Sequence, residues 1–178
     1  MGFFEKLKGT TKSPPGVSPK EIFWSWLGGF LGVGLLGLLA AGGLAQQEKV
    51  MLIGSFGASA VLLYGAPKSP LAQPRNLLGG HIFSGLVGVA CYKLFGEAPW
   101  FASAMAVSGA IALMHLTRTL HPPGGATALI AVIGGEKIHS LGFWYCLNPV
   151  ALGASIMLLV SLLVNNIPAH RRYPEFWI

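Results

Sequence analysis

Polar groups that could bind a small anion cluster around irregular stretches of an otherwise apolar chain. The clearest stretch runs from His121 to Leu129 and has the sequence HPPGGATAL. Two consecutive prolines end the preceding helix, because each lacks an amide hydrogen and forces the residue before it out of the α region. Proline suits the first turn of a helix, so Pro123 is expected to open a short one. Its first amides carry the positive end of the helix dipole. Gly124 and Gly125 leave those amides open, which is typical of a small-anion site.

A second stretch of the same kind lies 68 residues earlier. The segment GASAVL from Gly57 to Leu62 matches GATALI from Gly125 to Ile130, residue type for residue type. Each copy follows one long apolar run and precedes another, so the order span, short helix, span occurs twice. Short, interrupted helices at corresponding places in two halves indicate a transporter site near the middle of the membrane.

The side chains near these stretches are hydrogen-bond donors or cationic groups. The predicted substrate-binding residues are Ser55, Gly57, Ser59, His81, His121, Gly124, Gly125 and Thr127, with Arg75 and Arg118 as charge-compensating residues. Simpler roles stay open for most of them. The two arginines could extend toward the membrane surface, the hydroxyls could bond to their own helix, and His81 could bond to a neighbouring carbonyl. His121 adjoins irregular backbone, which at membrane depth faces protein or a wet cavity.

The distribution of charge excludes several classes of protein. The chain has no aspartate, and its six glutamates lie outside or at the edges of the apolar runs. Cation transporters place carboxylates inside the membrane, whereas a path lined by donors attracts anions. With no carboxylate to orient a histidine and no metal-ligand spacing, we expect no enzyme activity, metal or cofactor. Haem ligation by His115 and His121 is disfavoured, because a helix break separates them. Cys91 and Cys146 are expected to be buried.

The elements that position these groups are membrane helices. The chain has 178 residues, of which 53% are hydrophobic and 10% charged. Four apolar runs, at about 22–45, 77–95, 99–120 and 145–167, are long enough to cross a bilayer. The sequence therefore predicts an all-α polytopic membrane protein with four full transmembrane helices and two short broken or re-entrant helices. The predicted organisation is a basic tail (1–20), two membrane repeats (21–97 and 98–167) and a C-terminal tail (168–178).

Basic residues at both ends predict that both termini lie on the cytoplasmic or stromal side. Re-entrant short helices would give four crossings and two repeats of the same orientation. Crossing ones would give six crossings and an inverted pair, and the sequence leaves both open. The net charge of +6 is scattered at span ends, so nucleic-acid binding is not expected. Glycine-rich faces on the spans would allow close packing within one chain or in a homo-oligomer.

The HPPGGATA segment, together with GSFGASA from Gly54 and SPLAQPRN from Ser69 leading to His81, closely resembles the HPP family of integral membrane proteins. The family is named after its His-Pro-Pro motif and is usually described as having four transmembrane segments. Its cyanobacterial and plastid members have been linked to nitrite transport. The resemblance implies a nitrite transporter of a bacterial plasma membrane or a plastid membrane.

The residues and the resemblance lead to one main hypothesis, a channel or carrier for nitrite or a similar small monovalent anion, embedded in the lipid bilayer. The anion would lie between the amino ends of the two short helices. The alternative is a membrane scaffold or sensor subunit that transports nothing.

Overall fold

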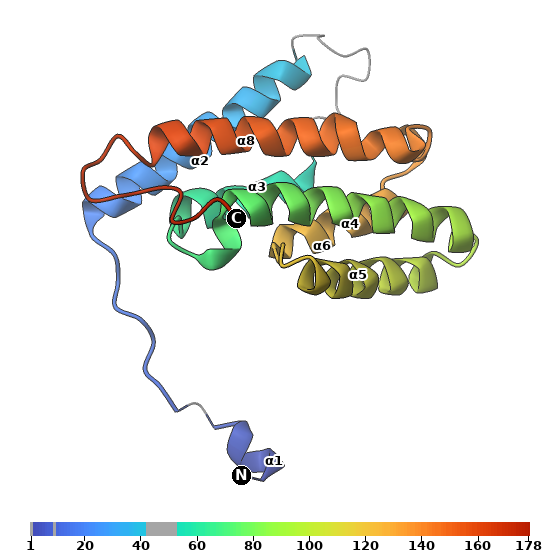
Figure 1. Ribbon diagram of the computed structural model, residues 1–178, viewed down its shortest axis with the longest axis horizontal. Helices are drawn as coiled ribbons and strands as arrows, with labels where there is room; N and C mark the ends of the chain where they lie inside the picture. The colour runs from blue at the N-terminus through green and yellow to red at the C-terminus, as the bar shows by residue number, and fades with distance from the viewer. Residues whose placement is uncertain (1, 9, 42–52) are drawn as a thin grey trace.

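The computed structural model describes residues 2–8, 10–41 and 53–178. These residues form helices and connecting loops without a β-strand (Figure 1). The helices are α1 (Phe3–Lys6), α2 (Pro19–Ala41), α3 (Gly54–Ala60), η1 (Val61–Gly65), η2 (Pro70–Ala72), α4 (Pro74–Phe95), α5 (Pro99–Leu116), α6 (Pro122–Ile133), α7 (Glu136–His139), η3 (Gly142–Cys146), η4 (Leu147–Ala151) and α8 (Leu152–Val164).

Four helices are long and apolar enough to cross a membrane, as the sequence predicted. They are α2, α4, α5 and the continuous segment Gly142–Val164, which includes α8. The boundaries differ by a few residues from the predicted ones. The first span begins at Pro19, and its predicted end at Ala45 lies outside the described residues.

The third span ends at Leu116 and not at Leu120. Arg118 adopts the left-handed conformation with φ of 56°, and the amide of Thr119 donates back to the carbonyl of Met114. This arrangement is a Schellman turn, which closes a helix before the prolines can do so. The following short helix then begins at Pro122, one residue before the predicted start.

The internal repeat is visible in the helix boundaries. The segment formed by α3 and η1 spans Gly54–Gly65, and α6 spans Pro122–Ile133, so both ends are displaced by the same 68 residues. Likewise α4 starts at Pro74 and its counterpart at Gly142. The two halves therefore have the same succession of elements, although their sequences match closely only around the short helices.

Successive membrane helices run in alternating directions in Figure 1. Along the long axis of the molecule α2, α4 and α6 run one way, and α3, α5 and α8 run the other way. Each short helix thus runs antiparallel to the span before it and to the span after it. The chain therefore does not turn back within a short helix. This geometry favours the interpretation with an inverted pair of repeats. The start of α2 and the end of α8 lie at the same end of the molecule (Figure 1).

Small residues allow α4 and α6 to pack with their backbones in contact. A Cβ atom added to Gly88 would lie 2.5 Å from the carbonyl oxygen of Ala128, and one added to Gly124 would lie 2.7 Å from that of Gly80. In membranes such small-residue faces promote helix association, because they let the backbones approach closely. This contact fixes the depth at which the start of α6 meets α4.

Two aromatic side chains of the first short helix, which consists of α3 and η1, occupy notches made by glycines. Phe56 lies against Gly153 of α8, where an added Cβ would come within 2.3 Å of its ring. Tyr64 lies against Gly28 and Gly32 of α2. Both aromatic residues are almost completely buried. Two of the glycines predicted as a packing face of the first span, Gly28 and Gly32, therefore receive an aromatic ring, whereas nothing lies within 4 Å of a Cβ added to Gly29, Gly34 or Gly37.

The C-terminal segment folds back onto the end of the molecule where α2 begins. The buried side chain of Arg171 bonds to Glu21 at 2.7 Å, to Ser25 at 2.8 Å and to Asn165 at 2.9 Å. The Tyr173 hydroxyl donates to the carbonyl of Ala72 at 2.8 Å, and burial raises the pKa of Tyr173 to about 12. This residue therefore remains a neutral donor at physiological pH.

Candidate functional site

The structure brings four of the predicted site residues into direct contact. Ser59 Oγ lies 2.7 Å from Nε2 of His81 and 2.8 Å from Nε2 of His121. The other ring nitrogen of His81 lies 2.7 Å from Thr127 Oγ1, and that of His121 lies 2.8 Å from the carbonyl oxygen of Leu71. All four side chains have zero exposure. We call Ser59, His81, His121 and Thr127 the polar cluster.

The positions of these residues follow from the repeat. Ser59 and Thr127 are equivalent residues of the two short helices, and each contacts one nitrogen of the same His81 ring. His121 is the N-cap residue of α6. The polar cluster therefore lies where the two short helices meet α4.

The Leu71 carbonyl, which lies at the His121 end of the cluster, fixes the direction of every hydrogen bond in the cluster when both rings are neutral. A carbonyl only accepts, so His121 Nδ1 carries its hydrogen toward Leu71, and its Nε2 accepts from the Ser59 hydroxyl. Ser59 has a single hydrogen and must therefore accept from His81 Nε2. His81 Nδ1 then accepts from Thr127. The cluster is a single directed chain of donors.

Only one histidine of the pair can readily carry a charge. The ring centroids are 5.0 Å apart. Two positive charges at that separation repel by about 3 kcal/mol at an effective dielectric constant of 20. No carboxylate among the described residues faces the rings, since the glutamates are exposed except for Glu21, which is bonded to Arg171. A positive charge on the cluster would thus attract a mobile anion.

Two buried hydroxyls next to the cluster lack hydrogen-bond partners among the described residues. They belong to Ser55, one turn before Ser59 on α3, and to Ser84, one turn after His81 on α4. Ser84 Oγ would lie 2.7 Å from a Cβ added to Gly124. A buried hydroxyl without a partner costs free energy, so both groups could donate to a bound solute. Sequence reasoning included Ser55 but missed Ser84, although its i+3 spacing from His81 placed it on the same face.

The backbone amides of α6 contribute less than the sequence indicated. Pro122 and Pro123 have no amide hydrogen, and the amide of Gly124 donates to the carbonyl of His121 at 2.8 Å. Gly124 is buried against Gly80 and Ser84, so its missing side chain serves helix packing. An anion contact with these amides stays a prediction, and the geometry favours side chains as the donors.

The remaining predicted site residues lie outside the polar cluster. Gly57 is exposed, and Gly125 is partly exposed on the side of Val107. Arg118 is exposed, whereas the Arg75 side chain donates to the carbonyl of Thr117 at 2.8 Å and so clamps the turn before His121. His81 and His121 are therefore the cationic candidates closest to the buried hydroxyls.

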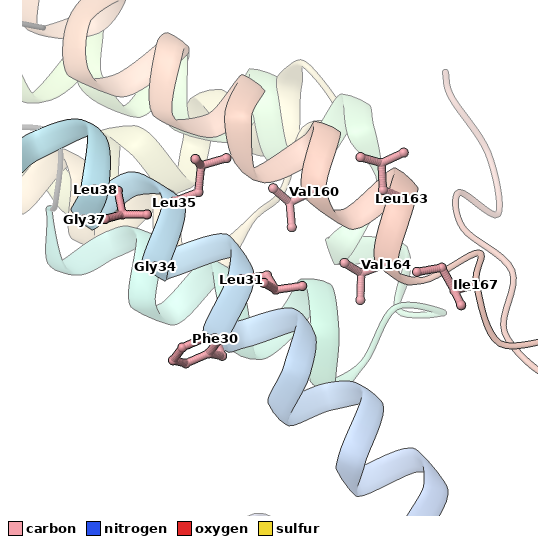
Figure 2. A pocket seen from close by; sticks show the side chains of 10 residues that line it. All are labelled: Phe30, Leu31, Gly34, Leu35, Gly37, Leu38, Val160, Leu163, Val164 and Ile167. Atoms are coloured by element: carbon pink, nitrogen blue, oxygen red, sulfur yellow. The ribbon is translucent and has the colours of Figure 1, made fainter. Parts of the chain in front are cut away.

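An apolar groove of about 800 Å³ lies elsewhere, between α2 and α8 (Figure 2). It is lined by Phe30, Leu31, Gly34, Leu35, Gly37, Leu38, Val160, Leu163, Val164 and Ile167. None of these side chains can donate to an anion. All but Ile167, which follows α8, lie on two membrane-spanning helices, and this position is typical of a surface that contacts lipid.

Comparison with known families agrees with this architecture. Residues 14–174 match the HPP transmembrane region. The chain belongs to the HPP transmembrane family. The resemblance inferred from the motifs is thereby confirmed, and this HPP protein is an integral membrane protein.

Two proteins of Dictyostelium discoideum, each named as a transmembrane protein, are similar to the HPP chain over nearly all its length. One is 50% identical over 178 residues, covering 98% of this chain and 57% of the relative. The other is 46% identical over 180 residues, covering 98% and 63%. The chain thus spans less than two thirds of either relative. No solved structure matches it.

Proposed function

We propose that this HPP protein transports a small monovalent anion, most simply nitrite, by way of the polar cluster. The observation that carries the proposal is a fully buried group of histidine and hydroxyl side chains where two repeated short helices meet. The buried hydroxyls of Ser55 and Ser84 are additional donors beside it. Donors with no carboxylate nearby among the described residues favour an anion over a cation.

We also propose on which side of the membrane the termini lie and which membrane holds the protein. Basic residues flank the first span and follow the last, and both of these ends lie on one side of the molecule. The positive-inside rule then assigns both termini to the cytoplasmic or stromal face. We propose a bacterial plasma membrane or a plastid membrane as the location. We further propose that the protein acts without enzymatic chemistry.

Nitrite uptake by proteoliposomes that contain the purified protein tests the proposal. We expect uptake above that of protein-free liposomes, and His121→Ala should reduce it about tenfold, because the variant removes one of the two rings that can carry the positive charge of the cluster. His115→Ala is the matched control, since His115 is exposed on α5. The absence of uptake, or equal uptake by wild type and His121→Ala, would contradict the proposal.

A membrane scaffold or sensor subunit is the second candidate. It is favoured by the fact that the four cluster side chains are buried and bonded to one another. In that role the cluster would only hold the short helices together. Wild-type protein would then show no uptake, and His121→Ala would lose stability without any change in flux.

A further inference from the structure

We propose that the polar cluster binds one proton together with each anion, so that the transported pair carries no net charge. The inference rests on the proposed function and specifies its mechanism. It starts from the chain of hydrogen bonds that runs from Thr127 through His81 and Ser59 to His121 and ends at the Leu71 carbonyl.

The chain can hold an added proton on either ring. Thr127 can pass its proton to His81 Nδ1 and take up another from the side at which the added proton enters. His81 then becomes an imidazolium. His81 Nε2 can then give its proton to Ser59 while Ser59 gives its own to His121 Nε2. The charge moves to His121, the Ser59 hydroxyl now points at His81, and no bond other than O–H and N–H changes.

Ser59 makes this transfer between the rings. Its oxygen lies within 2.8 Å of both Nε2 atoms, and it is the only side chain in the described structure that bonds to both rings. Because the rings are 5.0 Å apart and buried, a second proton would place two like charges together without compensation. The cluster is therefore a site for one proton.

The surroundings leave the charge to be balanced by a solute. The first short helix presents serines, and Met114 of α5 contacts the His121 amide. The nearest titratable groups of the last span are Tyr145, which donates to the Thr127 carbonyl at 3.1 Å, and Cys146, which lies against Gly85.

On α4 the charged residues are Arg75, which bonds to the Thr117 carbonyl, and Lys93, which lies in the last turn of the helix. None of these groups is a carboxylate. The counter-charge of a protonated cluster is therefore a monovalent anion, and the free hydroxyls of Ser55 and Ser84 lie one helical turn from it.

Uptake of nitrite under separately imposed gradients tests the coupling. With the membrane potential clamped to zero, a pH gradient that is alkaline inside should drive uptake and acidify the lumen faster than in protein-free liposomes. A potential alone should drive none. Ser59→Ala should reduce the pH-driven uptake about tenfold, because the proton can no longer pass between the rings.

Ser155→Ala is the matched control, since that hydroxyl bonds only to the Ala151 carbonyl of its own helix. Uptake driven by potential and indifferent to the pH gradient would overturn the coupling while leaving anion transport intact. No uptake at all would contradict the proposed function instead.

The proton site has a readout that needs no transport. Nitrogen NMR of histidine-labelled protein in lipid, assigned with His81→Gln and His121→Gln, should find the hydrogen on Nδ1 of His121 and Nε2 of His81 at neutral pH. Acidification should add one proton that changes both rings together. The opposite tautomers, two separate titrations, or no proton uptake would overturn the inference.

Discussion

The His81 ring bonds to residues of both repeats. One of its nitrogens contacts Ser59 of the first short helix, and the other contacts Thr127 of the second. The two hydroxyls are equivalent by the 68-residue offset. A single imidazole thus joins the two halves of the protein through one bond to each.

Much of this residue-level picture could be predicted from sequence. The repeat indicated that Ser59 and Thr127 are equivalent residues, and the break in the helix indicated His121 as a site residue. The bonding of both histidines to Ser59 could not be predicted, because it depends on the depth at which α4 crosses the short helices. That depth is set by the contact of Gly88 with Ala128, and Gly88 lies outside the motifs.

Arg118 offers a test that separates backbone strain from charge. A non-glycine residue in the left-handed region costs about 1 kcal/mol, so Arg118→Gly should be more stable than Arg118→Ala by roughly that amount. Thermal unfolding in detergent measures the difference. If the arginine charge also supports transport, both variants should lose nitrite uptake equally. A Gly variant no more stable than the Ala variant would contradict the assignment of the turn.

At the scale of the elements, glycine faces decide how the helices associate. The α4–α6 contact and the aromatic notches of α2 and α8 all depend on a missing side chain. The sequence indicated close packing from its many glycines but not which of them are in contact. Helix ends were also approximate, because an αL arginine closed α5 where the sequence pointed to the prolines.

Gly88→Ala should disrupt the contact between α4 and α6. The added methyl group would lie 2.5 Å from the carbonyl oxygen of Ala128 and 2.8 Å from its Cα atom, and backbone atoms cannot give way easily. We expect a loss of about 1–3 kcal/mol in the free energy of unfolding. Gly29→Ala on α2 is the control, because nothing lies within 4 Å of its added Cβ. Equal stability of the two variants would refute the proposed role of Gly88.

At the scale of the whole molecule, apolar side chains form two buried clusters. One joins α4, α5 and α6 through residues such as Ala106, Met114 and Ala128. The other joins the first short helix with α2, the last span and one face of α4. The sequence predicted the number and order of spans, because hydropathy and length determine them. It gave no indication that the last residues of the chain fold back, since that depends on single polar contacts.

The C-terminal segment should depend on one buried arginine. Arg171→Ala removes one of the two cationic partners of Glu21, which keeps His170, and leaves Asn165 Oδ1 without its donor. We therefore expect a loss of about 1–3 kcal/mol in the free energy of unfolding. Arg172→Ala, at the exposed neighbouring position, is the control and should leave the unfolding midpoint unchanged. Protease accessibility of the last residues should increase only in the first variant. The same accessibility in both would contradict this role.

The aromatic notches have a mechanical consequence. Because Phe56 is fixed against α8 and Tyr64 against α2, the first short helix cannot slide by itself, and it must travel with those two spans as one rigid unit. The contacts of this unit with α4 and α6 include the bonds of Ser59 to the two histidines, the bond of Tyr145 to the Thr127 carbonyl, and Cys146 against Gly85. We expect a passage for a solute to open at these contacts, because the aromatic notches hold the first short helix to α2 and α8.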